Sequence, residues 1–193
     1  AFDEATAILA GDALQVLAFE ILVEDASLPV EPARRLEMVR MLAQASGTRG
    51  MAGGQAMDLA AVGRLLERSQ IEDMHARKTG ALIRAAVLIA CAAAPTLSAS
   101  KLKALDRYGT TVGLSFQIVD DLLDVVGDTT LTGKTRGADA LRAKPTYPAI
   151  AGIAAARERA VELADAGIEA LAGFGPEAGQ LRDFAAELVE RSR

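Results

Sequence analysis

Hydrophobic and polar residues follow a helical period along most of this 193-residue chain. Apolar residues recur at spacings of three and four, which places them on one face of an α-helix. Pro32 suits the first position of a helix, and Ser69 with Glu72 has the form of a capping box. The pattern predicts helices over residues 3–24, 32–46, 69–94, 99–126, 154–172 and 176–191.

The segments between these helices carry turn residues. Residues 27–32 contain two prolines, residues 128–139 are polar and contain glycine, and residues 142–148 combine prolines with cations. Gly11 lies inside the first helix, where glycine costs about 1 kcal/mol relative to alanine, so we expect another helix to approach closely there. We find no linker, repeat or low-complexity tract, and predict that residues 1–193 form one all-α domain, a single helical bundle.

Residues 113–127 interrupt an apolar helix with three carboxylates and a glutamine. At about 100° per residue, Asp120 and Asp124 lie one turn apart. Gln117 lies one turn before Asp120, and Asp121 lies at the edge of the same stripe. Because the other faces are apolar, the helix is predicted to be buried except along this anionic stripe.

An anionic stripe on a buried helix requires positive charge nearby, because an unpaired buried carboxylate is costly. Mg²⁺ is the best candidate. It takes one or two protein carboxylates and completes its shell with water and phosphate oxygens. The alternative is an acidic helix face paired with lysine or arginine side chains. The apolar surround favours the metal.

Composition supports the helical class and excludes others. Hydrophobic residues make up 51% of the chain and aromatic residues 4%, as expected for closely packed helices. The net charge of −5 argues against a nucleic-acid-binding protein. The single cysteine, Cys91, excludes an intramolecular disulfide and is expected to be a buried thiol. Residues 85–94 form the most apolar run but are shorter than the roughly 20 residues that span a bilayer, so no stable membrane insertion is expected.

Two further polar segments are candidates for function. Gln55 and Asp58 follow two glycines and are neighbours if residues 53–58 are helical. Taken alone, this segment indicates helix packing through the glycines, with both polar side chains facing water. Residues 75–80 begin with His75, which has no partner histidine or nearby cysteine. We therefore expect His75 at the surface or at a helix end rather than in a zinc site.

Five motifs together resemble those of a known family. They are Gly-Gly-Gln-x-x-Asp at 53–58, Lys-Thr-Gly at 78–80, Phe-Gln-x-x-Asp-Asp-x-x-Asp at 116–124, Gly-Lys at 133–134 and Lys-Pro-Thr-Tyr-Pro at 144–148. Their order and spacing resemble those of trans-polyprenyl diphosphate synthases, especially bacterial farnesyl and geranylgeranyl diphosphate synthases. The resemblance covers essentially the whole chain and implies a helical bundle of the isoprenoid synthase type.

The resemblance implies a prenyltransferase of isoprenoid biosynthesis. Such an enzyme condenses an allylic diphosphate with isopentenyl diphosphate by Mg²⁺-assisted ionisation and makes farnesyl or geranylgeranyl diphosphate. Asp120 is implied as the direct metal ligand, with Asp121 and Asp124 acting largely through metal-bound water. The ammonium groups implied to bind the diphosphate are those of Lys78, Lys134 and Lys144. Lysine suits this role because it is a mobile point charge.

The resemblance also implies a catalytic set consisting of Lys78, Thr79, Gln117 and Asp120. The side-chain oxygen of Gln117 and the main-chain carbonyl of Thr79 are implied to face the carbocation, where a dipole stabilises the charge without attacking it. The residues implied to support these groups from the surrounding layer are Gln55, Asp58 and Asp139. A cytoplasmic homodimer is the implied assembly.

The sequence also departs from the family. We find no first aspartate-rich motif, and no Gly-Lys-Arg or His/Arg element for isopentenyl diphosphate. We therefore expect the N-terminal third of the family's domain to be missing and this chain alone to be inactive. One alternative is a non-catalytic helical subunit that assembles with a complete synthase. A terpene cyclase is disfavoured, because its second metal motif typically mixes Asn or Asp, Ser or Thr, and Glu.

Overall fold

A computed structural model of the chain describes residues 3–94, 96–126 and 144–191, and every regular element within them is a helix. The elements are α1 Glu4–Glu24, α2 Pro32–Ser46, α3 Met51–Ala60, α4 Arg68–His75, the π-helical turn η1 Ala76–Gly80, α5 Ala81–Ala93, α6 Ala99–Val126, α9 Tyr147–Ala151, α10 Ile153–Ala170, the 3₁₀ turn η2 Pro176–Ala178 and α11 Gly179–Glu190. The predicted all-α class is confirmed for these residues.

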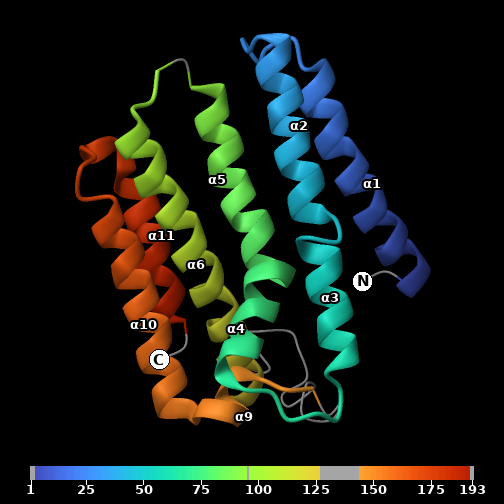
Figure 1. The fold of residues 1–193 in the computed structure, drawn as a ribbon, viewed down its shortest axis with the longest axis vertical. Coiled ribbons are helices and arrows are strands. Elements are labelled where there is room, and N and C mark those ends of the chain that lie inside the picture. Colours follow the sequence, from blue (N-terminus) through green and yellow to red (C-terminus); the bar gives the residue numbers. More distant parts are fainter. Residues whose placement is uncertain (1–2, 95, 127–143, 192–193) are drawn as a thin grey trace.

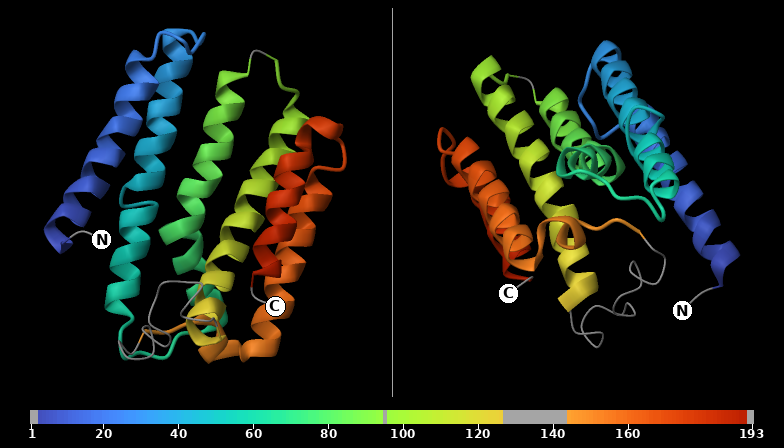
Figure 2. Two further views of the ribbon diagram at one scale, coloured as in Figure 1. Left: turned by 180° about the vertical axis from the view of Figure 1, so that it is seen from behind. Right: turned by 60° about the horizontal axis from the view of Figure 1, so that its bottom comes forward.

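The long helices form a bundle with α5 and α6 side by side in its middle (Figure 1). Helices α10 and α11 pack on α6 from one side, and α2 packs on α5 from the other. Helix α1 lies outermost, against α2 (Figure 2). The elements α3, α4, η1 and α9 gather with the C-terminal end of α6 at one end of the bundle. This end contains most of the predicted site.

The core lies where α6 packs against α10. On α10, Ala156 and Ala160 are fully buried one turn apart, and their small side chains let the two helices approach closely. On α6, Ile118 and Leu122 are fully buried in the same cluster. Burying each of these larger side chains stabilises the fold by ~2 kcal/mol. The hydroxyl of Ser115 donates to the Ala160 carbonyl at 2.9 Å, which satisfies a buried polar group in this contact.

One arginine holds the turn between α1 and α2. Arg35 donates hydrogen bonds of 2.5 to 3.4 Å to five main-chain carbonyls, those of Leu22, Val23, Asp25, Leu28 and Val30. These carbonyls belong to the end of α1 and the turn after it, where no further helical N–H is available. Arg35 therefore fixes α1 against α2, although α1 has no buried residue.

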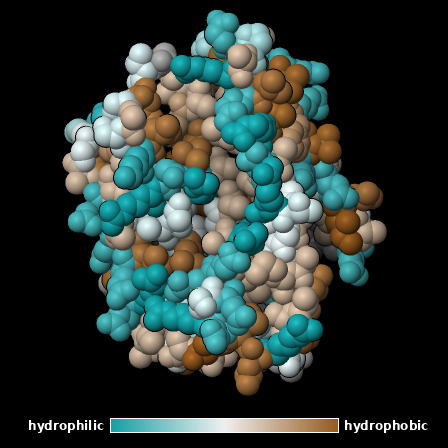
Figure 3. Space-filling view, viewed as in Figure 1, coloured by the Kyte–Doolittle hydropathy of each residue, from teal (hydrophilic) through white to brown (hydrophobic). Residues whose placement is uncertain are grey.

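Helix α1 presents apolar side chains to water along its length. The large exposed ones are Ile8, Leu9, Leu14, Val16, Leu17, Ile21 and Val23. Hydrophobic atoms, drawn brown, are visible at the edge of the molecule that α1 forms (Figure 3). Among the described residues, α1 is the one helix that is long and apolar enough to cross a membrane, by length and composition alone.

Most predicted helix boundaries agree closely with the structure, but two local predictions are wrong. A Cβ at Gly11 would meet no heavy atom within 4 Å, because α1 lies on the outside of the bundle, so no helix approaches there. Helix α4 begins one residue earlier than predicted, at Arg68. Its capping box uses Gln70, whose side chain accepts from the Glu67 N–H at 2.8 Å. Glu72, predicted as part of that box, has different contacts.

Candidate functional site

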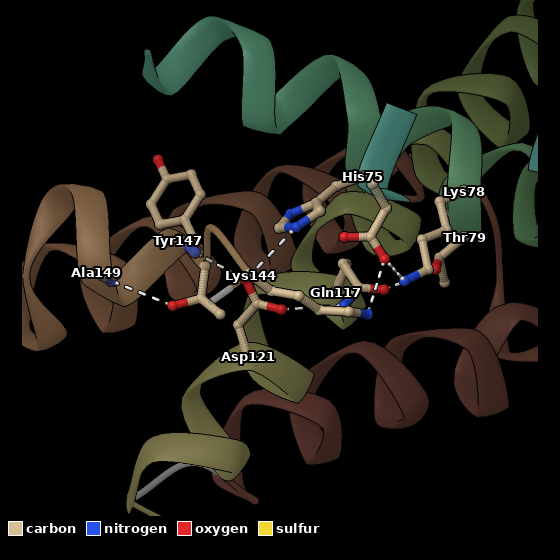
Figure 4. A network of polar contacts seen from close by, with 10 residues as sticks. His75, Lys78, Thr79, Gln117, Asp121, Lys144, Tyr147 and Ala149 are labelled. Carbon is tan, nitrogen blue, oxygen red and sulfur yellow. Dashed lines mark hydrogen bonds and ion pairs between the residues drawn. The ribbon is translucent and has the colours of Figure 1, made fainter. Parts of the chain in front are cut away.

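The three aspartates of the predicted stripe lie near the C-terminal end of α6, where η1 and α9 pack on it. They are not equivalent. Asp120 and Asp124 are half-buried, whereas Asp121 is buried, as is Gln117 one turn earlier. Figure 4 shows Gln117 and Asp121 among side chains that come from several elements. The predicted accessible stripe therefore includes Asp120 and Asp124 but not Asp121.

A π-helical turn between α4 and α5 carries the Lys78 and Thr79 motif. A π-helical turn contains more residues than an α-helical turn, and such turns occur often at functional sites. The hydroxyl of Thr79 donates to the side-chain oxygen Oε1 of Gln117 at 2.6 Å. Lys78, the preceding residue, contacts α3 (Figure 4). The two consecutive side chains of η1 thus contact two different helices.

Two glycines allow α3 and α6 to approach this turn. A Cβ at Gly54 of α3 would lie 2.3 Å from the main-chain nitrogen of Lys78. A Cβ at Gly113 of α6 would lie 2.8 Å from the Cα atom of Gly80. Because both neighbours are backbone atoms, no side chain fits at either position without a shift of the helices. The predicted helix packing through glycine is confirmed at Gly54.

Asp58 brings two of the predicted lysines together. Its Oδ2 atom accepts from Lys78 Nζ at 2.6 Å and from Lys144 Nζ at 3.0 Å. Burial would raise the pKa of this carboxyl group, but the two lysine contacts outweigh burial and hold the pKa below its usual value. Asp58 is 3% exposed, so the expectation that it faces water is wrong.

The segment that carries Lys144 is anchored through Tyr147. The main-chain N–H of Tyr147 donates to Asp121 Oδ2 at 2.8 Å. The Tyr147 hydroxyl donates to Glu72 Oε1 at 2.9 Å. One end of this residue is thereby bonded to α6 and the other to α4. Lys144 reaches Asp58 from a segment that these two contacts hold in place.

The sequence pattern predicts that Glu72 belongs to a capping box. In the structure Glu72 instead contacts three side chains. Its Oε1 atom accepts from Tyr147 and lies within 3.4 Å of the guanidinium groups of Arg68 and Arg159. Burial would raise the pKa of Glu72, but the hydrogen bond from Tyr147 and the arginine contacts keep the pKa below its usual value. An ionised Glu72 therefore joins α4, α9 and α10.

His75 lies at the end of α4, one of its two expected positions, but it is buried against the site, so the expected surface position is wrong. Burial and the nearby positive charge of Lys78 lower its pKa to about 4, and the imidazole is therefore neutral at pH 7. Its Nε2 atom lies 3.5 Å from Asp121 Oδ2, and its Nδ1 atom is buried without a hydrogen-bond partner in the described part of the chain. One signal could have found it: His75 lies one helical turn before Lys78 and Thr79.

The remaining predicted residues are distributed as follows. Gln55 is half-buried on α3, one turn before Asp58. Lys134 and Asp139 lie outside the described residues. The residues that the structure brings together are Asp58, Lys78, Thr79, Gln117, Asp121 and Lys144.

A divalent cation would find ligands along the accessible part of the stripe. Within the residues that the structure describes, no three His, Cys, Asp or Glu side chains form a group that could hold a metal. Asp120 and Asp124 lie one turn apart and are both partly accessible. Two carboxylates are sufficient for Mg²⁺, which takes its other ligands from water and substrate phosphate. The donors present therefore fit this ion.

Comparison with known proteins gives consistent matches over nearly the whole chain. A sequence model of the polyprenyl synthetase family matches residues 1–169. Farnesyl diphosphate synthase of Escherichia coli is 51% identical over 165 residues, which cover 85% of this chain and 55% of that protein. Farnesyl diphosphate synthase of Haemophilus influenzae is 42% identical over 163 residues, which cover 84% and 55%. The chain spans about half the length of these curated relatives.

The fold also matches solved structures. A geranyltransferase of Helicobacter pylori, complexed with magnesium and isoprenyl diphosphate, superposes with a TM-score of 0.81 at 30% sequence identity. The match covers 98% of this chain and 61% of that one.

Proposed function

Because the chain belongs to the polyprenyl synthetase family, we propose that it carries the part of a prenyltransferase that ionises an allylic diphosphate. The complete enzyme would couple the resulting carbocation to isopentenyl diphosphate and form farnesyl or geranylgeranyl diphosphate. The similarity to two farnesyl diphosphate synthases supports this reaction. Elements that this sequence does not contain would supply the first aspartate motif and the site for isopentenyl diphosphate.

The observation that carries the proposal is a pair of ammonium groups next to the aspartate stripe. Lys78 and Lys144 come from different elements and contact the same buried carboxylate. One lysine would neutralise Asp58, so the cluster of Asp58 with these two lysines keeps one positive charge beside the aspartate stripe. Negative charge develops on diphosphate as it leaves. Preplaced cations stabilise that charge strongly where water is excluded.

The accessible aspartates would complete this charge arrangement with Mg²⁺. Asp120 would bind the ion directly and Asp124 through water, and Lys134 would add a third ammonium group. Bound Mg²⁺ supplies charge neutralisation to the leaving diphosphate. The magnesium and isoprenyl diphosphate in the Helicobacter pylori relative support this assignment.

The allylic cation would face two oxygen atoms of this chain. Gln117 Oε1 and the main-chain carbonyl of Thr79 each present the negative end of a dipole, which stabilises positive charge without forming a bond to carbon. The hydrogen bond from the Thr79 hydroxyl to Gln117 Oε1 keeps these two residues side by side, which supports this proposal. Gln55 and Asp139 would support the surrounding layer.

The proposed assembly is a homodimer in the cytoplasm. Helix α1 exposes a long apolar surface and contacts α2 on one side. A second copy of the chain would cover this surface and bury the exposed leucine, isoleucine and valine side chains. Burial of apolar area of this kind is the main stabilising term in obligate dimers.

Calorimetric titration of the chain with inorganic pyrophosphate tests the proposed function. We expect weak binding that requires Mg²⁺ and that weakens by about tenfold or more in Lys78→Met and in Asp120→Asn. Asp106→Asn is the matched control, because Asp106 lies on the same helix and pairs with the exposed Arg84. If neither Lys78→Met nor Asp120→Asn changes the affinity for pyrophosphate, the alternative of a non-catalytic helical subunit is favoured.

An assay with geranyl diphosphate, isopentenyl diphosphate and Mg²⁺ completes this test. The chain alone is expected to form no product, because the first aspartate motif and the second substrate's site are both missing. Losing several stabilising contacts should raise the barrier by well over the ~3 to 4 kcal/mol of a single contact. Turnover near the rate of a complete synthase would show that the assignment of the missing elements is wrong.

A further inference from the structure

Asp121 differs from its neighbours in the stripe in both burial and contacts. Its side chain is 6% exposed, whereas Asp120 and Asp124 are half-buried. Its Oδ1 atom accepts from the side-chain amide of Gln117 at 3.1 Å. Its Oδ2 atom accepts from the main-chain N–H of Tyr147 at 2.8 Å. Both carboxylate oxygens are therefore already bonded to donors of the protein.

The contact with Asp121 determines which way the Gln117 amide points. A carboxylate only accepts hydrogen bonds, so the end of the amide that faces Asp121 must be the donor Nε2. Oε1 then faces Thr79, whose hydroxyl donates to it at 2.6 Å. A hydroxyl can donate or accept, so Thr79 would tolerate either orientation. Asp121 is the partner that selects one.

We propose that Asp121 is a positioning residue that holds the Gln117 carbonyl oxygen toward η1 and the substrate, rather than a ligand of Mg²⁺. This inference rests on the proposed function, in which Gln117 Oε1 faces the carbocation. A reversed amide would present its N–H groups, the positive end of its dipole, to a positive charge. Asp121 thus acts through Gln117, and the metal is left to Asp120 and Asp124.

The same carboxylate connects the amide to the lysine pair. Asp121 Oδ2 holds the main chain of Tyr147, three residues after Lys144. Lys144 in turn reaches Asp58 and stands next to Lys78. A carboxylate with two fixed donors is well suited to this positioning role, because moving toward a metal would break at least one buried hydrogen bond.

The side-chain ¹⁵N–¹H signals of Gln117, assigned by their loss in Gln117→Met, test the inference without substrate or metal. A carboxylate acceptor is expected to shift one Nε2 proton downfield. Asp121→Asn places an amide there, which can donate to Gln117 Oε1 and allow the Gln117 amide to reverse, so the downfield signal should disappear. Asp120→Asn, one residue away, should leave it in place. An unchanged signal in Asp121→Asn would overturn the inference.

Thr79→Val keeps the inference testable if Asp121→Asn does not fold. This variant removes a partner that selects no orientation, so the downfield signal is expected to remain. Its loss would show that Thr79 sets the orientation and would overturn the role of Asp121.

Mg²⁺-dependent binding of pyrophosphate separates this inference from the proposed function. We expect Asp120→Asn to weaken binding by about tenfold or more and Asp121→Asn by less than about threefold. If both variants weaken pyrophosphate binding equally, Asp121 would be a metal ligand like Asp120, and the inference would be overturned. Lack of pyrophosphate binding by the parent chain would count against the proposed function, while the Gln117 signals would still decide the role of Asp121.

Discussion

Asp58 pairs with the ammonium groups of two lysines, Lys78 and Lys144. Its side chain is 4% exposed, while Lys78 and Lys144 keep 27% and 18% of their side-chain surface in contact with water. Asp58→Asn should lower the free energy of unfolding by about 2 to 3 kcal/mol, less than for a fully buried pair because the lysines are partly hydrated. Urea unfolding measures this. Asp106→Asn, which breaks an exposed pair with Arg84, should cost less than about 1 kcal/mol.

The pH dependence of the difference in unfolding free energy between the parent and Asp58→Asn tests whether the charge of Asp58 causes it. The pKa of Asp58 is lower in the folded chain than in the unfolded chain, so its ionisation stabilises the fold above the unfolded pKa. That stability is lost as the pH falls through the folded pKa. The difference between parent and Asp58→Asn should therefore be complete at pH 6 to 7 and should shrink below about pH 4. A difference that stays constant down to pH 3 would point to packing instead of charge.

At the scale of elements, the position of η1 depends on glycine contacts from two helices. Gly54→Ala and Gly113→Ala place a Cβ against backbone atoms of Lys78 and Gly80, and each should lower stability by about 1 to 3 kcal/mol. Gly11→Ala is the matched control. It lies in open space on a helix and should raise stability by up to about 1 kcal/mol. If the thermal midpoint of Gly54→Ala equals that of the parent, the close contact between Gly54 and η1 does not determine the stability of the fold.

The boundaries of a helix can be predicted well from the sequence where one apolar pattern continues over many residues. Helix α6 begins and ends at the predicted residues, because 28 residues keep one apolar period and the flanking segments break it. The π-helical turn η1 could not be predicted. It continues the helical pattern of α4 and α5, and a shift of hydrogen-bond partner from four to five residues changes no residue type.

The candidate site was predicted as a set of residues but not as an arrangement. The motifs identify Lys78, Gln117 and Lys144 by type and spacing. Whether a polar side chain faces water or a partner depends on residues far along the chain: Lys144 lies 86 residues from Asp58. The expected wet position of Asp58 and surface position of His75 failed for this reason. Local pattern gives no information on such contacts.

At the scale of the whole molecule, α1 is the helix that leaves a large apolar surface exposed to water. A helix with no buried residue gains little from the bundle beyond its contact with α2. Its exposed apolar side chains favour association, since monomeric proteins rarely expose large continuous apolar surfaces. For the chain by itself, without the further elements of a complete synthase, two kinds of occupant can cover this surface, namely a second copy of the chain and a lipid bilayer. Asp12 and Glu20 lie within α1, and a charged side chain at the bilayer centre costs ~2.5 to 3.5 kcal/mol.

We therefore expect self-association through α1 rather than insertion. Sedimentation velocity over a dilution series should show a concentration-dependent dimer, which Leu14→Glu with Ile21→Glu should abolish, because both side chains are exposed on the same face of α1. Leu65→Glu, at a fully exposed position in the turn after α3, is the control and should behave like the parent. The parent should not float with phosphatidylcholine vesicles. Flotation of the parent that the double variant abolishes would identify α1 as a membrane-binding helix and exclude the dimer as its main partner.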